Sequence, residues 1–457
     1  MSSFSAITQA SQALQAFQDA LSVTGNNIAN ANNTGYSRET VAFGQNQPDP
    51  IYSPTGTQFI GTGVNIASVD RMRSMFLQAQ NLASSSNLGQ TNAQLAGGQQ
   101  VQALFTDASG SGISNDLTSF YNSWSSLAAQ PNSANLQAVQ QAGITLTTDV
   151  RNTYSNLQQL TTQANGQVSQ TIQQIQGLAA QISQLNGEIR TQSAGGGQPN
   201  ALLDQRDQAV QQLSTLVNVS TQTLPDGTMA VNVSQFDLVD RAGAHAFPTT
   251  YNAASGTVTS GGDSYNVTGG QLAGNFATIN SISGTMSNLD SLANSLRTQV
   301  NSLMSTGKTA NGTTGQNFFN DASPQTGAVD FNLDPAVLAD FKNIATGTTG
   351  NTGDTTLALQ IADSSTQSVA ALGNQSTSNY YNGLVSGVGQ QVSTATNTLS
   401  TQTAVSTQIQ NQIQSISGVS VDQEMTNMIQ YQRSYQAAAQ TLNIVNSTLT
   451  DLLAIVH

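Results

Sequence analysis

The side chains that most often carry out chemistry in proteins are scarce in this chain. It has no cysteine and only two histidines, His245 and His457, and neither has a His or Cys neighbour at metal-ligand spacing. Zinc needs three or four converging ligands, and disulfides and thiolate sites need cysteine. The sequence also lacks a GxxxxGK[ST] phosphate loop and a GxSxG nucleophile elbow. We therefore expect no catalytic centre, no cofactor and no metal site, and a protein that is not an enzyme.

The composition narrows the class of partner. Only 8% of the 457 residues are charged and the net charge is -13, against about 25% charged residues in an average domain. The 11 basic residues are scattered singly, whereas phosphate contacts need clustered Lys and Arg, so we expect no nucleic-acid binding. No apolar run reaches the length of about 18 residues that would predict a membrane span. No Lys or Arg precedes Arg38, so the charged start of a secretory signal is missing.

Both ends of the chain carry apolar residues at a strict spacing of seven, which keeps one stripe of a helix facing a partner helix. The other faces are almost uncharged, since Asp19 is the only charged residue from Met1 to Ser37. We expect both helices to be packed on several sides by copies of this chain or by related chains. We call the two stripes the assembly seams: Ile7, Leu14, Leu21 and Ile28 at the N-terminus, and Val421, Met428, Tyr435, Leu442, Leu449 and Val456 at the C-terminus.

The periodicity predicts a mainly α fold with an inserted β domain. Long helical-bundle or coiled-coil rods, with the N- and C-terminal helices paired, are expected because helical spacing dominates both flanks of one alternating segment. That segment contains a hairpin signal at Pro225-Asp226-Gly227. The expected parts are 1–60 and 417–457 as the two halves of an inner coiled-coil domain, 61–216 and 274–416 (with a loop-rich 305–355) as the two halves of a helical rod domain, and 217–273 as the β domain.

Three local motifs stand out, and the first, at thirteen residues, is longer than a helix cap needs. The plainest interpretation of the first is a helix end and a turn, and of the second a capped helix start with local Asp/Arg pairing. The third is either a capped core helix or, as its lack of charge favours, a helix buried between subunits. Their key residues are Asn26, Asn27, Ile28, Asn30, Gly35, Tyr36, Ser37 and Arg38; then Leu203, Asp204, Arg206 and Asp207; then Gly418, Val419, Asp422, Glu424 and Met425.

Together these motifs resemble those of the first hook-associated protein of the bacterial flagellum, the FlgK family. Residues 26–39 are similar to the family signature NNIANANTPGYSRQ, with Asn33-Thr34 in place of Thr-Pro and Glu39 in place of Gln. Residues 418–439 resemble its C-terminal signature GVSLDEEMxNLIxFQxAYQASA, and residues 202–207 its LLDxRD run. The end of the β domain, residues 269–274, also resembles the family.

The resemblance implies a structural protein of the extracellular flagellum, at the junction between hook and filament. Members are secreted by the flagellar type III apparatus with a dedicated chaperone, which is expected at the C-terminal helix. They self-assemble into a ring that joins hook protein to the third hook-associated protein. The absence of cysteine suits a chain that passes unfolded through a narrow channel.

Other classes of protein make different demands on the sequence. Hook protein, another axial protein, has mostly β structure between its termini, whereas long helical patterns dominate here; the third hook-associated protein is a further alternative. An extracellular adhesin shares the Ser/Thr/Asn-rich composition but needs a secretion signal or a membrane anchor. An axial protein with an inserted protease needs an HExxH-type site, which two isolated histidines do not supply.

Overall fold

The structure is a computed structural model that describes residues 3–53, 56–105, 112–321, 326–351 and 353–456. The chain forms two compact units, which are described separately below. Unit 1 comprises Met1–Asn87, Gln174–Phe247 and Gln402–His457, and unit 2 comprises Leu88–Gln173 and Pro248–Thr401. Helices hold 65% of the residues, which confirms the predicted mainly α class with a small inserted sheet region.

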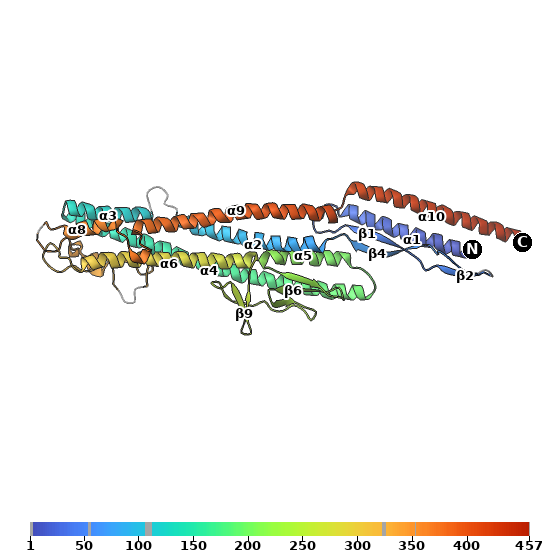
Figure 1. The fold of residues 1–457 in the computed structure, drawn as a ribbon, viewed down its shortest axis with the longest axis horizontal. Helices are drawn as coiled ribbons and strands as arrows, with labels where there is room; N and C mark the ends of the chain where they lie inside the picture. Colours follow the sequence, from blue (N-terminus) through green and yellow to red (C-terminus); the bar gives the residue numbers. More distant parts are fainter. Residues whose placement is uncertain (1–2, 54–55, 106–111, 322–325, 352, 457) are drawn as a thin grey trace. The chain divides into compact units, whose positions relative to one another are not determined.

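The helices and strands follow one another as labelled in Figure 1. The helices are α1 (Ser3–Ala29), α2 (Met75–Ala103), α3 (Ile113–Ala129), α4 (Ser133–Ala194), α5 (Asn200–Leu216), α6 (Gly270–Met304), α7 (Pro335–Ala339), α8 (Thr356–Asp363), α9 (Thr377–Ser417) and α10 (Val421–Val456). The strands are β1 (Glu39–Gln45), β2 (Asp49–Ser53), β3 (Gly56–Ile60), β4 (Val64–Arg71), β5 (Ser220–Thr223), β6 (Met229–Val233), β7 (Phe236–Val239), β8 (Thr250–Asn252), β9 (Thr257–Ser260) and β10 (Asp263–Asn266).

In unit 1 the two terminal helices pack side by side, as Figure 1 shows for α1 and α10. The buried face of α1 is built largely from small side chains, including Ala10, Ala16 and Ala20. Small residues let neighbouring backbones approach closely. The antiparallel pair β1–β4 also contacts α1. The ring of Phe43 on β1 lies 5.8 Å from Phe17 of α1 and 5.9 Å from Tyr431 of α10, so one aromatic row joins all three elements.

The alternating segment forms two separate three-stranded antiparallel sheets. The order β5–β6–β7 lies in unit 1 and the order β10–β9–β8 in unit 2. In unit 1 the side-chain amide of Asn186, on α4, accepts from the Met229 N–H (2.9 Å) and donates to the Met229 carbonyl (2.8 Å). An amide that satisfies both backbone groups of a strand residue fixes the sheet on the helix. The limits of a β domain at 217–273 stay a prediction.

Unit 2 has an aromatic core that the sequence pattern does not reveal. Among the described residues of segment 305–355 the helical pieces are short, yet Phe318, Phe319 and Phe331 are fully buried. Asn301 of α6 holds this segment, because its side-chain oxygen Oδ1 accepts from the Phe318 and Phe319 N–H groups (3.0 Å each). The buried Arg297 adds an ion pair with Asp330 at 3.0 Å. An irregular segment buries side chains at uneven spacings, so the sequence shows no periodic pattern that would predict which of them are buried.

Helix α6 crosses α2 within unit 2 at a glycine. A Cβ added at Gly274 would lie 2.4 Å from the Gln90 carbonyl oxygen and 2.6 Å from the Ala93 Cβ, whereas one added at Gly284 of the same helix meets nothing within 4 Å. We expect Gly274→Ala to lower the free energy of unfolding by about 1–3 kcal/mol through overpacking. Gly284→Ala should raise it, by up to about 1 kcal/mol. Urea unfolding of the two variants measures both; equal effects would contradict this account of the crossing.

Candidate functional site

The first and third motifs meet in unit 1 around the side chain of Asn27. Its Nδ2 donates to the Glu39 carbonyl (2.8 Å) and to Glu424 Oε2 (3.1 Å). Its Oδ1 accepts from the Tyr36 hydroxyl (2.7 Å) and the Glu39 N–H (3.0 Å). All four hydrogen-bonding positions of the amide are used. This geometry requires two donors and two acceptors on a short side chain, which explains asparagine at a position that is 1% exposed.

The carboxylate of Glu424 is buried at the start of α10. It is 2% exposed and accepts from Arg38 Nε (2.8 Å) as well as from Asn27. Burying a carboxylate is costly unless it is paired and hydrogen-bonded, and here both conditions are met. Burial, assisted by the nearby carboxylate of Glu39, raises the pKa of Tyr36, so its hydroxyl stays a donor. We call Asn27, Tyr36, Arg38 and Glu424 the clasp.

The second motif adds a group of alternating charges beside the clasp. Arg71 Nη1 lies 2.6 Å from Asp204 Oδ1 and 3.0 Å from Asp207 Oδ2, and Arg73 Nη1 lies 2.6 Å from the same Asp207 oxygen. We call these four residues the anchor. The Ser37 N–H donates to Asp204 Oδ2 at 3.1 Å, which connects the anchor to the clasp. One polar network thus joins α1, β4, α5 and α10.

The prediction of local pairing within the second motif is wrong. Asp204 and Asp207 pair with arginines more than 130 positions away. Arg206 instead donates to the Gly227 carbonyl (2.7 Å) and to Asn186 Oδ1 (3.1 Å) at the edge of the first sheet. On an α-helix, neighbouring residues point in different directions. The two aspartates therefore face the arginines, while Arg206 faces the sheet. Burial lowers the pKa of Arg206 to about 10, which still leaves it charged at neutral pH.

Arg71 and Arg73, which pair with the aspartates of the second motif, lie outside all three sequence motifs. The sequence feature that points to these two arginines is the scarcity of basic residues in the chain. In a chain with 11 basic residues, two arginines only two positions apart indicate a place that needs positive charge.

The remaining motif residues surround the network without entering its centre. Asn30 donates to the Asn26 carbonyl and side chain and ends α1. Gly35 precedes Tyr36 in the turn, where Asn33 Oδ1 accepts its N–H. Gly418 follows α9, where the Ser417 carbonyl accepts the Arg38 N–H.

The other residues of the three motifs differ in exposure. Leu203, Ile28 and Val419 are half-buried, whereas Asn26, Asp422 and Met425 are exposed.

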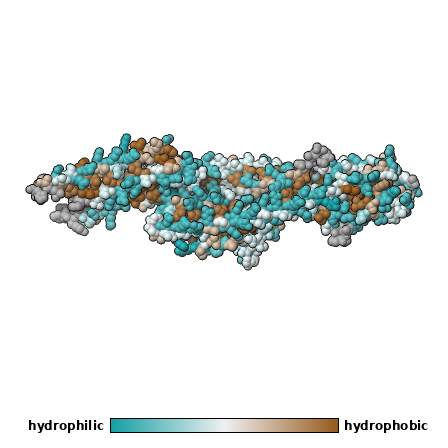
Figure 2. Space-filling view, turned by 180° about the vertical axis from the view of Figure 1, so that it is seen from behind, coloured by the Kyte–Doolittle hydropathy of each residue, from teal (hydrophilic) through white to brown (hydrophobic). Residues whose placement is uncertain are grey.

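The seam residues of unit 1 are mostly half-buried on the paired helices. This holds for Ile7, Leu14, Leu21, Ile28, Met428, Leu442 and Leu449. Val421 and Tyr435 are 42% and 36% exposed, and the side chain of Val456 lies outside the described part of the structure. On α10, Met425, Ile429 and Ile444 are more exposed still. Figure 2 shows apolar, brown surface interrupting the hydrophilic surface on one face of the molecule. The role of the seams in assembly stays a prediction.

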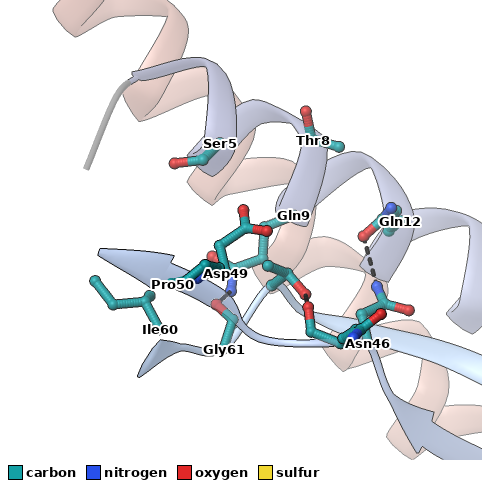
Figure 3. Close-up of a pocket in the computed structure, with 11 residues that line it drawn as sticks. Ser5, Thr8, Gln9, Gln12, Asn46, Asp49, Pro50, Ile60 and Gly61 are labelled. Carbon is teal, nitrogen blue, oxygen red and sulfur yellow. Dashed lines mark hydrogen bonds between the residues drawn. The ribbon is translucent and has the colours of Figure 1, made fainter. Parts of the chain in front are cut away.

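A groove lies beside the first turns of α1 (Figure 3). It has a volume of about 610 Å³ and is lined by α1 residues, including Gln9 and Gln12, and by the β2–β3 hairpin. Gln9 donates to the Gly61 carbonyl (3.0 Å), and Asn46 donates to Gln12 (2.7 Å). Asp49 is the one ionisable group among its described lining residues. A neutral amide lining offers hydrogen bonds but no acid–base pair.

The described residues contain no group of three or more His, Cys, Asp or Glu side chains that could hold a metal ion. His245 is exposed and lies 3.0 Å from Asp240, and His457 falls outside the described residues. In the same described part of the chain, no helix has the length and apolarity needed to span a bilayer.

The chain matches three protein-family models along its length. Residues 98–319 match the flagellar hook-associated protein FlgK helical domain, residues 410–455 the flagellar basal body rod FlgEFG protein C-terminal model, and residues 7–36 the flagella basal body rod protein model. The two terminal models span most of α1 with the turn after it, and the end of α9 with nearly all of α10.

Full-length relatives and a solved structure agree with these matches. Flagellar hook-associated protein 1 of Bacillus subtilis is 28% identical and aligns over 99% of this chain and 98% of its own length. The proteins of the same name from Salmonella typhimurium and Escherichia coli are 26% and 25% identical, over 99% of this chain and 100% of theirs. The flagellar hook junction protein FlgK from Burkholderia pseudomallei shares the fold, with a TM-score of 0.64 and 16% identity over 74% of this chain and all of that one. The chain is therefore similar, over its full length, to proteins of the flagellar hook-associated protein 1 family.

Proposed function

We propose that this chain is a structural subunit of the bacterial flagellum that joins the hook to the filament by helical self-assembly. The observation that carries the proposal is that both ends of the chain match models of flagellar axial proteins. Relatives named flagellar hook-associated protein 1 align over 99% of the chain, and the terminal helices that axial rod models match lie paired in one unit. The half-buried seams leave apolar surface for further chains.

The partners we propose follow from the proposed position of this chain between two other axial proteins of the flagellum. They are other copies of this chain, the hook protein on one side and the third hook-associated protein on the other. We also propose that the chain is secreted by flagellar export and that a dedicated chaperone covers α10 before assembly. The exposed apolar side chains of α10, which include Met425, Ile429 and Ile444, support a need for cover in the free chain.

A structural role without catalysis is the third part of the proposal. The charged side chains of the clasp and the anchor pair with one another, and Asp49 is the one ionisable group among the described residues that line the groove beside α1. Among the alternatives, hook protein is not favoured, because the helical-domain model matches residues 98–319.

Electron microscopy of a strain that lacks this protein tests the function. We expect hooks of normal length without filaments, and flagellin released into the medium, because the subunit that seats the filament is missing. Complementation with the unaltered chain should restore filaments. Filaments firmly attached to hooks in the deletion strain would refute the proposal.

A further inference from the structure

Four asparagines in the chain are followed directly by glycine, and the fold treats one of these pairs differently from the others. Three pairs are helical: Asn165-Gly166 and Asn186-Gly187 in α4, and Asn382-Gly383 in α9. The fourth, Asn311-Gly312, lies in a turn of unit 2. An Asn-Gly pair is chemically labile, because glycine has no side chain to hinder attack by its nitrogen on the preceding side-chain amide. The fold therefore decides which of the four pairs reacts.

The three helical pairs are restrained in two ways. Within an α-helix the glycine N–H donates to the carbonyl four residues earlier, and the asparagine side chain points towards the helix N-terminus, away from that nitrogen. Each of the three asparagine side chains also accepts a hydrogen bond: Asn165 from the Tyr251 hydroxyl (2.7 Å), Asn186 from the Met229 N–H (2.9 Å) and Asn382 from the Ser114 hydroxyl (3.3 Å). Ring closure at any of these pairs requires the helix to open.

Asn311 lacks both restraints. Its side chain is exposed, and no hydrogen bond to it is found among the described residues. Gly312 has a φ of +76°, and a Cβ added there would meet nothing within 4 Å, so the space around it is open. The Gly312 N–H donates to the Thr309 carbonyl at 2.9 Å. A turn hydrogen bond at an exposed position opens far more readily than one in the interior of a long helix.

We propose that Asn311 is a site of spontaneous deamidation in the folded chain, a modification that goes beyond the proposed function. The Gly312 nitrogen loses its proton to hydroxide and attacks the side-chain carbonyl carbon of Asn311. The new C–N bond closes a five-membered succinimide ring, and the bond to the side-chain nitrogen breaks to release ammonia. Water then opens the ring at either carbonyl, which gives aspartate or isoaspartate. Water is the only co-reactant consumed, and no electrons are transferred.

The product alters a turn that contacts a neighbouring segment of unit 2. The Thr309 N–H donates to the Thr313 carbonyl at 2.9 Å, which closes the turn. A Cβ added at Gly350 would lie 2.9 Å from the Gly312 Cα, so the turn touches the segment that contains Gly350. Isoaspartate carries an extra methylene in the backbone, which lengthens the turn at residue Asn311. Deamidation therefore adds a negative charge and loosens this contact.

Incubation of the purified full-length chain at mildly alkaline pH tests the proposal, because hydroxide drives the first step. Trypsin cuts after Lys308 and Lys342, so the peptide 309–342 contains Asn311 and no other Asn-Gly pair. Mass spectrometry measures the replacement of amide by acid, and chromatography separates the aspartate and isoaspartate forms. We expect Asn311 to react at least about tenfold faster than Asn382, which is also exposed but lies in α9.

An unfolded reference and a variant separate the effect of the fold from that of the local sequence. In guanidinium chloride Asn311 and Asn382 should react at rates within about threefold of each other, since the helix around Asn382 is gone. Asn311→Gln has one more methylene, so the corresponding ring needs six members and closes more slowly. This variant should remove the fast reaction from the peptide 309–342.

Four results would overturn the proposal. They are equal rates at Asn311 and Asn382 in the folded chain, no acid at Asn311 after an incubation that fully modifies the unfolded chain, a fast reaction in 309–342 that survives Asn311→Gln, and a preference for Asn311 that persists undiminished in guanidinium chloride. None depends on flagella, so failure here is distinguishable from failure of the proposed function, which the deletion strain tests.

Discussion

A strain whose only copy of this protein carries Leu442→Asp should assemble hooks but no attached filaments. Leu442 is half-buried on α10, the helix that packs against α1. The exchange removes an apolar side chain whose full burial contributes about 1.5–3 kcal/mol. It also places a charge without a partner in a seam that we expect other copies to cover, which costs more. Electron microscopy of the cells and swimming in soft agar measure the outcome.

Two further variants separate the seam from a general effect of charge. Leu21→Asp, on the N-terminal seam, should have the same effect as Leu442→Asp. Asn252→Asp adds the same charge at an exposed position on β8, outside the terminal helices, and should leave swimming normal. Normal filaments on the Leu442→Asp strain would show that the seams do not carry assembly.

Replacing Arg71 by Met should lower the free energy of unfolding of the purified chain by about 3–5 kcal/mol. The Arg71 side chain is 7% exposed and separates the carboxylates of Asp204 and Asp207, which are 10% and 15% exposed. Without it, Asp204 loses its only ion-pair partner among the described residues, and two partly buried carboxylates repel each other. Met preserves most of the volume, so the loss reports charge rather than packing. Urea unfolding measures it.

The control for this prediction is an ion pair at the surface. Arg241 pairs with Asp226 at 3.1 Å but is 70% exposed. Exposed pairs contribute about 0–1 kcal/mol, so Arg241→Met should change the urea midpoint little. If Arg71→Met were as mild as Arg241→Met, the anchor would not stabilise unit 1 as its burial implies.

Periodicity predicts the helices well here, because long helices repeat their apolar face many times. Between residues 136 and 190, apolar residues recur at spacings of three, four and seven, and the structure forms one helix there, Ser133–Ala194. Turn chemistry at Pro225-Asp226-Gly227 likewise located the hairpin of β5 and β6. The motifs pointed to residues that do converge, Asn27, Asp204 and Glu424 among them, but the sequence did not show that they form one network.

Long-range pairing is the part that one sequence does not specify. Arg71 and Asp204 are 133 positions apart, and nothing local distinguishes this partner from any other aspartate. The division of the alternating segment into two sheets is hidden for the same reason, since each strand satisfies the same pattern in either arrangement. The aromatic core around Phe318 and Phe331 was missed because an irregular segment buries side chains without any period.

The most direct test of the central claim is a cryo-electron microscopy map of the hook–filament junction from intact flagella, in which this chain is traced from its side chains. We predict rings of this protein between hook and filament, with α1 and α10 forming the innermost wall and their seams in contact with neighbouring copies. A junction built from another chain, or one in which the paired terminal helices face the outside, would contradict the account.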